Sequence, residues 1–214
     1  MKTEELSQIE RRVKSYWYTD GLGELIGGAL FILLGIFFFL QSFFGKDSIL
    51  TNWLQASLAV LVISGVFASR WVINHLKIRL TYPRTGFVEY RVDQQDLGRR
   101  RIVVITLGGA AAVVFVALAK LIGSTNWIPA ATGLIVAFFL FIIQGRAAGL
   151  QRFNILGAVS IAVGISLSFS GLSEGYALGS YYGLLGLAFV ISGGIVLRHY
   201  LQDNPFPVDT GHER

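Results

Sequence analysis

Residues 25–45, LIGGALFILLGIFFFLQSFFG, contain no charged side chain and are almost entirely apolar. At 1.5 Å of rise per residue, roughly 20 such residues cross the hydrocarbon core of a bilayer, which is about 30 Å thick. The pattern recurs along the chain, and the charge-free stretches are Leu25–Gly45, Ser48–Ser69, Ile102–Ala119, Leu121–Gly145, Phe153–Ser173 and Gly175–Leu197. The sequence therefore predicts an all-α membrane protein with six transmembrane helices arranged as three hairpins.

The composition supports a single membrane domain. Hydrophobic residues make up 53% of the 214 residues and charged residues only 14%, whereas about a quarter of the residues of a soluble domain are charged. We expect residues 20–200 to form the six-span domain and residues 201–214 to form a disordered cytoplasmic tail. Residues 1–19 combine an apolar face with basic residues and end in the aromatic run Tyr16–Tyr18, a pattern that predicts an amphipathic helix lying on the membrane surface.

The distribution of basic residues predicts the orientation of the chain. Sixteen of the eighteen Lys and Arg residues fall before span one, between spans two and three, between spans four and five, or after span six, and only Lys46 and Lys120 fall on the other side. Under the positive-inside rule both termini are then cytoplasmic. The same rule accounts for the pI of about 9.6, so we expect no nucleic-acid partner.

The loop at residues 77–101 has a chemistry of its own. Two β-rich runs, Ile78–Tyr82 and Phe87–Arg91, flank Pro83–Gly86, in which Pro presets a turn and Gly accepts a positive φ. The sequence predicts a short cytoplasmic β-hairpin here, held against the inner membrane face. Its basic residues are candidates to bind anionic lipid headgroups, a membrane-protein partner or acidic groups such as Asp20. They are Arg79, Arg84, Arg91, Arg99, Arg100 and Arg101.

This loop also carries a resemblance. The stretch Thr81–Val88, TYPRTGFV, together with Asp20–Leu22, resembles a set of uncharacterised bacterial inner-membrane proteins that share a Y-P-R-x-G-[YF]-V loop between early spans. The resemblance covers the first half of the chain. It implies a location in the bacterial plasma membrane and transfers no activity, cofactor or catalytic residue.

Glu24 is the candidate for an ion pair inside the membrane domain. It lies four residues after Asp20 and therefore on the same face of span one. A buried carboxylate needs a partner, and the arginines at the same depth are Arg70, Arg146, Arg152 and Arg198. We expect Arg70 to be the partner, because span two follows span one in a short hairpin. A proton or ion site at Glu24 is the alternative to a structural lock.

Small residues predict where the helices pack. Gly21, Gly28 and Gly35 recur at intervals of seven residues in span one, and Gly179 and Gly183 form a G-x-x-x-G pattern in span six. These glycines allow close approach of helices, within one chain or between the copies of a homo-oligomer.

No catalytic motif, metal-ligand pattern or cofactor-binding motif is apparent in the sequence, which lacks Cys and has three His. We therefore expect a non-catalytic membrane protein, an accessory or regulatory subunit of a membrane complex. A small oligomeric transporter or channel is the alternative. A membrane enzyme acting on lipid headgroups is the third reading, and its sign would be a cavity that unites Glu24, His75, Tyr82 and Arg84.

Overall fold

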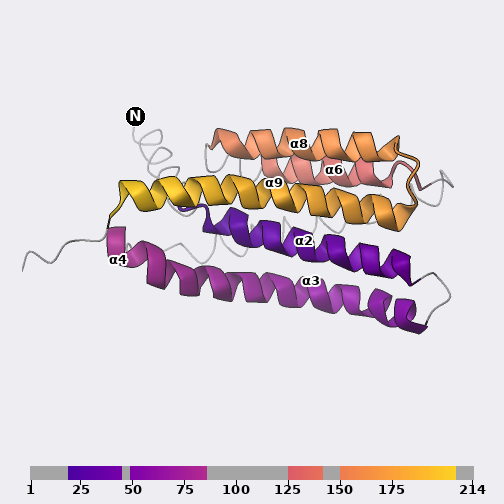
Figure 1. The fold of residues 1–214 in the computed structure, drawn as a ribbon, viewed down its shortest axis with the longest axis horizontal. Helices are drawn as coiled ribbons and strands as arrows, with labels where there is room; N and C mark the ends of the chain where they lie inside the picture. The colour runs from indigo at the N-terminus through magenta and orange to yellow at the C-terminus, as the bar shows by residue number, and fades with distance from the viewer. Residues whose placement is uncertain (1–18, 45–48, 86–124, 142–149, 206–214) are drawn as a thin grey trace, which may run out of the picture.

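The computed structural model describes residues 19–44, 49–85, 125–141 and 150–205 of the chain. The regular structure of these residues is helical throughout (Figure 1). The main helices are α2 (Leu22–Phe43), α3 (Ile49–Leu76), α6 (Ile128–Phe139), α8 (Gln151–Ser168) and α9 (Glu174–Asp203). A π-helical turn (Lys77–Thr81) and the short helix α4 (Tyr82–Thr85) continue α3.

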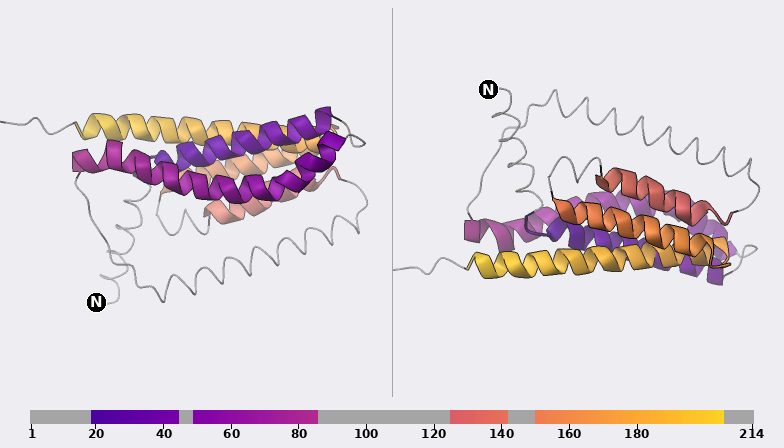
Figure 2. Two further views of the ribbon diagram at one scale, coloured as in Figure 1. Left: turned by 90° about the horizontal axis from the view of Figure 1, so that it is seen from below. Right: turned by 90° about the horizontal axis from the view of Figure 1, so that it is seen from above.

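The helices lie side by side with nearly parallel axes, in the order α3, α2, α9, α8, α6 (Figures 1 and 2). Neighbours in this row are not always neighbours in the chain, because α2 packs against α9. A core of buried apolar side chains fills the space between α6, α8 and α9. It consists of Leu140, Phe153, Leu156, Tyr181, Leu185 and Phe189.

Three helical stretches of the described residues are long and apolar enough to cross a membrane: Leu22–Phe43, Ala56–Thr81 and Glu174–Asp203. The prediction of six transmembrane helices in three hairpins is therefore wrong. Helix α6 has 12 residues, well short of a span, and α8 begins with the polar residues Gln151 and Arg152. Charge-free stretches and helices do not coincide, because α3 and α9 include charged residues whereas α6 is shorter than the charge-free stretch that contains it.

The predicted β-hairpin is also wrong, because its first run is helical in the structure. Residues 86–101 lie outside the described residues. A strand was expected from the β-branched and aromatic residues of Ile78–Tyr82, but such propensity depends on context. Here the run follows directly on α3, and extending a helix that already exists adds a hydrogen bond for each residue fixed.

Glycines of α2 and α9 form a continuous contact, the glycine seam, in which the two helices run antiparallel. A Cβ atom added to Gly21 would lie 2.6 Å from the Gly193 carbonyl oxygen, and one added to Gly28 would lie 2.7 Å from that of Gly186. At Gly35 the nearest atoms belong to the Gly183 and Gly179 backbones, at 2.8 and 2.9 Å. Gly35 thus meets the predicted Gly179 and Gly183 inside one chain, whereas Gly21 and Gly28 meet Gly193 and Gly186.

A buried hydroxyl pair joins the remaining helices. Ser160 of α8 donates to the Gly133 carbonyl of α6 at 3.0 Å, and its Oγ lies 2.7 Å from the Tyr181 hydroxyl of α9. Both side chains are fully buried, and buried hydroxyls need such partners. The serines of α8 include one that fixes helix packing.

Candidate functional site at the charged end of the bundle

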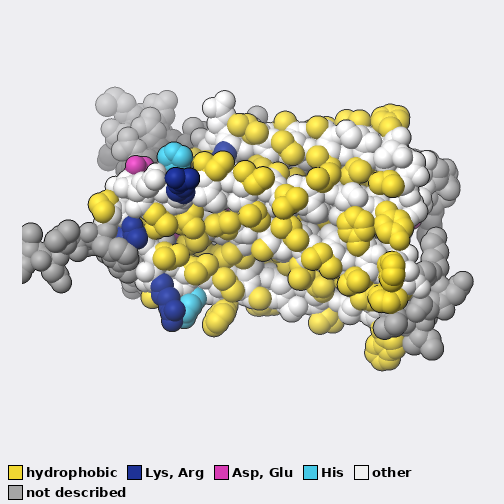
Figure 3. Space-filling view, in the orientation of Figure 1, with side chains coloured by type: hydrophobic (Ala, Val, Ile, Leu, Met, Phe, Trp, Pro, Cys, Tyr) yellow, Lys and Arg dark blue, Asp and Glu magenta, His cyan; other side chains and the backbone are white. Residues whose placement is uncertain are grey.

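Charged side chains of the described residues gather at one end of the bundle, and hydrophobic side chains cover the rest of the face seen in Figure 3. This charged end holds six basic residues and three carboxylates: Arg70, Lys77, Arg79, Arg84, Arg152, Arg198, Asp20, Glu24 and Asp203. The start of α2, the end of α9 and the π-helical turn meet here. The site is built from two buried ion pairs and a helix cap.

The first ion pair connects α2 with α8. Glu24 lies in the first turn of α2 and only 3% of it is exposed. Arg152 Nε lies 2.7 Å from its Oε1, and Ser192 of α9 donates a hydrogen bond of 2.6 Å to its Oε2. One carboxylate therefore contacts two further helices. A charge taken out of water needs this kind of compensation.

The second ion pair connects α2 with the π-helical turn. Asp20 precedes α2 and is 1% exposed. Its Oδ1 accepts the Leu22 amide at 3.2 Å, which satisfies a donor at the helix start. Its Oδ2 lies 3.2 Å from Lys77 Nζ and accepts the Thr81 hydroxyl at 3.4 Å.

The helical conformation of residues 77–81 makes this second pair possible. Lys77 and Thr81 both reach Asp20 Oδ2 and both are buried. Four residues span about 6 Å along an α-helix and somewhat less along a π-helix, but about 13 Å along a strand. Two side chains four apart in a strand could not contact the same carboxylate oxygen.

Arg84 completes the charged end by capping α9. Its Nη1 donates to the carbonyl oxygens of Leu201 and Asn204, at 3.0 and 2.8 Å. The last carbonyls of a helix lack partners within the helix and carry partial negative charge. Arg84 had been expected to face lipid phosphates or an acidic group such as Asp20. In the structure Asp20 forms its ion pair with Lys77, and Arg84 hydrogen-bonds to the end of α9.

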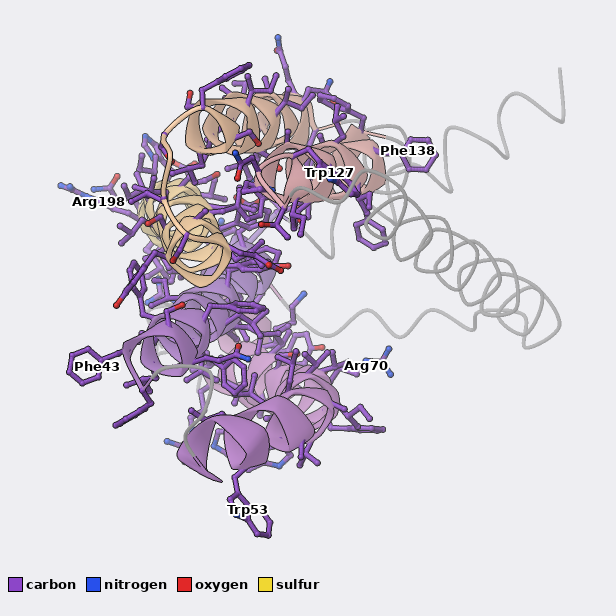
Figure 4. All side chains as sticks on the ribbon, turned by 90° about the vertical axis from the view of Figure 1, so that its right-hand side faces the viewer. Phe43, Trp53, Arg70, Trp127, Phe138 and Arg198 are labelled. Carbon is purple, nitrogen blue, oxygen red and sulfur yellow. The ribbon has the colours of Figure 1, made fainter. Side chains whose placement is uncertain are left out.

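The other predicted site residues are dispersed. Arg70, the expected partner of Glu24, lies exposed on α3, and Arg152, another of the arginines considered for that role, holds Glu24 instead. Figure 4 shows Arg70 and Arg198 projecting on opposite sides of the bundle. Arg79 is exposed on the π-helical turn. Arg91, Arg99, Arg100 and Arg101 lie outside the described residues.

Sequence reasoning missed Lys77, Thr81 and Ser192. Lys77 enters the sequence prediction only as one of the sixteen basic residues that set the orientation, and no motif surrounds Ser192. One signal was available, because Lys77 and Thr81 are spaced to share a helical face. The spacing is informative only if residues 77–81 are predicted to continue the helix α3.

The residues proposed for an enzyme have separate surroundings. Glu24 is held by Arg152, Arg84 caps α9, and His75 stacks on Trp71, with ring centroids 5.5 Å apart, on the exposed side of α3. A groove of about 460 Å³ does lie at the charged end, between the end of α9 and the residue before Asp20. It is lined by Thr19, Ile195, Val196, His199, Tyr200, Asp203 and Asn204.

Comparison of the chain with protein-family models, with curated proteins and with solved structures found no match. The function is therefore argued from the charged end itself. Its arrangement can hold α2, α3, α8 and α9 in fixed positions, since each buried carboxylate contacts groups from other parts of the chain.

Proposed function

We propose that this chain is a non-catalytic integral membrane protein that serves as an accessory subunit of a membrane complex. The proposal rests on one observation, namely that the buried carboxylates connect helices to one another. Asp20 and Glu24 each contact a cation and a hydroxyl group from other helical segments. Ionisable residues within a membrane domain usually mark a functional site. Here they join helices into a rigid frame, which suits a protein that presents a fixed surface to a partner.

We propose further that the protein lies in the bacterial plasma membrane with its charged end in the cytoplasm. Six basic residues against three carboxylates at that end favour this orientation. Residues 19 and 205, where the described chain begins and ends, both belong to the charged end. Both termini are then cytoplasmic, and the chain crosses the membrane more than once.

Purification of the intact, tagged chain in a mild detergent, followed by mass spectrometry, tests the accessory role. We expect one partner membrane protein in stoichiometric amount. The matched variants are Gly28→Ala, which places a Cβ 2.7 Å from the Gly186 carbonyl oxygen, and Gly27→Ala, whose Cβ would have nothing within 4 Å. The first should lose the partner and the second should keep it. Purification of the chain alone, with no partner in detergent or in native lipid particles, would contradict the proposal.

A cation-coupled transporter is the second candidate, favoured by one observation. Asp20 and Glu24 are buried carboxylates four residues apart at the start of α2, and membrane transporters use such groups as relays. Flux measurements in vesicles containing the purified chain distinguish the two candidates. Flux that Glu24→Gln abolishes while the variant remains folded supports transport, whereas absence of flux in wild-type vesicles leaves the accessory role.

A further inference from the structure

Helix α3 carries an exposed row of side chains spaced four residues apart. Ile63, Phe67 and Trp71 are 60%, 68% and 69% exposed, and His75 and Arg79 follow in the same register and are exposed as well. Positions four apart lie above one another on a helix with a drift of about 40° per step. The residues from Ile63 to His75 therefore wind by about 120° around α3, and Arg79 follows in the π-helical turn. These five residues, the α3 stripe, lead from the apolar part of α3 to the charged end.

The α3 stripe changes from apolar to cationic along its length, which matches the apolar acyl chains and anionic headgroup of a phospholipid. Ile63 and Phe67 are apolar, Trp71 is of the type that favours the membrane interface, and Arg79 is cationic. Ile63 lies about 12 Å along the helix axis from Trp71. That distance is close to the hydrocarbon thickness of one leaflet, about 15 Å. An acyl chain alongside Ile63 and Phe67 would thus place its headgroup beside His75 and Arg79.

One ring contact and the exposure of Arg79 distinguish this surface from the positions of Lys77, Arg84 and Arg152. The Trp71 and His75 rings are stacked, with centroids 5.5 Å apart and an interplanar angle of 15°, so the imidazole has a defined orientation at the interface. Lys77, Arg84 and Arg152 are engaged inside the bundle, whereas the Arg79 side chain is exposed. Arg79 is thus placed to bind a phosphate from the bilayer, and the ligand that its charge fits is anionic.

We propose that the α3 stripe is a binding site for one anionic phospholipid, with the acyl chain on Ile63 and Phe67 and the phosphate on His75 and Arg79. The site is independent of the accessory role, because it requires no protein partner. Each basic residue near a membrane surface contributes about 1 kcal/mol toward anionic lipid. Loss of Arg79 should therefore reduce affinity about fivefold.

Native mass spectrometry of the full chain in detergent, titrated with phosphatidylglycerol or with neutral phosphatidylcholine, tests the site. We expect wild-type protein to retain phosphatidylglycerol in preference to phosphatidylcholine, and Arg79→Gln to bind phosphatidylglycerol about fivefold more weakly. Arg79→Lys should keep most of the affinity, because it keeps the charge. Trp71→Ala should weaken binding of both lipids, since the aromatic surface contacts the glycerol region.

Arg198→Gln is the matched control, since Arg198 is also exposed at the charged end and projects from another side of the bundle. It should bind phosphatidylglycerol as the wild type does. Equal affinity of Arg79→Gln and wild type would overturn the proposal, as would equal affinity for the two lipids. Loss of a co-purifying protein from Arg79→Gln, with lipid binding unchanged, would assign the stripe to a protein partner and overturn it too.

Discussion

At the scale of single residues, Glu24 and its partners show how a charge is kept inside the bundle. The Glu24 side chain is 2% exposed, while that of Arg152 is 20% exposed. Loss of the ion pair should therefore affect Glu24 more than Arg152. An arginine can extend its head group toward water when it loses its partner, but a carboxylate that is enclosed on all sides cannot.

This asymmetry predicts unequal effects of two substitutions. Arg152→Met should lower the free energy of unfolding by about 3 kcal/mol, because it leaves a buried charge unpaired. Glu24→Gln should cost only about 1 kcal/mol, since Gln can still accept the Ser192 hydroxyl and Arg152 can turn outward. Denaturation with a charged detergent, followed by tryptophan fluorescence, measures both.

The double variant Arg152→Met with Glu24→Gln completes a double-mutant cycle. Combining the two substitutions should cost less than the sum of the separate effects, because neither charge is then left behind. Arg198→Gln, an exposed position at the same end, should change stability by less than about 0.5 kcal/mol. Equal costs for Arg152→Met and Glu24→Gln would show that Glu24 is not enclosed as described.

Arg84 permits a second prediction at this scale. Its Nη1 donates to two carbonyl oxygens at the end of α9, so Arg84→Gln should increase fraying of the last turn. A loss of about 1.4 kcal/mol corresponds to roughly tenfold faster amide hydrogen exchange at the end of α9. Arg79→Gln, which alters an exposed side chain one turn earlier, serves as the control. Unchanged exchange in Arg84→Gln would mean that the cap does not hold the helix end.

At the scale of helices, the glycine seam sets the distance between α2 and α9. Cβ atoms added at Gly21, Gly28 and Gly35 would meet backbone atoms of α9, which cannot move aside without separating the helices. Gly27 and Gly23 lie on the same helix, yet added Cβ atoms there would have open space within 4 Å. Position on the helix face therefore determines which glycines are needed.

Alanine substitutions should separate the two kinds of glycine. Gly28→Ala should destabilise the protein by about 1–3 kcal/mol, the usual cost of overpacking. Gly27→Ala should be neutral or slightly stabilising, because alanine favours the helix. The same unfolding titration measures both variants. A stable Gly28→Ala variant would be incompatible with a backbone contact at the seam.

Part of this arrangement could be predicted from sequence and part could not. The stretch Leu25–Gly45 located α2 within a few residues, because apolar length and charge-free length nearly coincide there. The stretch Ser48–Ser69 ended too early, since α3 continues past Arg70, whose exposed side chain the helix tolerates. An arginine partner for Glu24 followed from depth, but Arg152 rather than Arg70 could be identified only once the packing order of the helices was known.

At the scale of the whole molecule, the two ends of the bundle differ in chemistry. Nine of the charged groups that the structure describes lie at one end, and Glu174 lies at the other with Trp53, Trp127 and Phe43. Aromatic residues favour a membrane interface, and basic residues favour the cytoplasmic side. In the proposed orientation, the long axis of the bundle crosses the membrane.

Because the chain has no native Cys, single cysteines can report this orientation. Arg198→Cys and Phe43→Cys replace exposed residues at opposite ends of the bundle. In intact cells a membrane-impermeant maleimide should label Phe43→Cys and leave Arg198→Cys unlabelled, and both should react after permeabilisation. Labelling of Arg198→Cys in intact cells would show that the protein has the opposite orientation.

The contact between α2 and α9 also has a consequence for biosynthesis. Helix α2 lies near the start of the 214-residue chain and α9 near its end, so most of the protein must be translated between them. At 5–20 residues per second this takes on the order of ten seconds. During that interval the glycines of α2 lack their opposite surface and Glu24 lacks Ser192. A chain whose synthesis stops before α9 therefore leaves the glycine face of α2 uncovered and Glu24 without its Ser192 hydrogen bond.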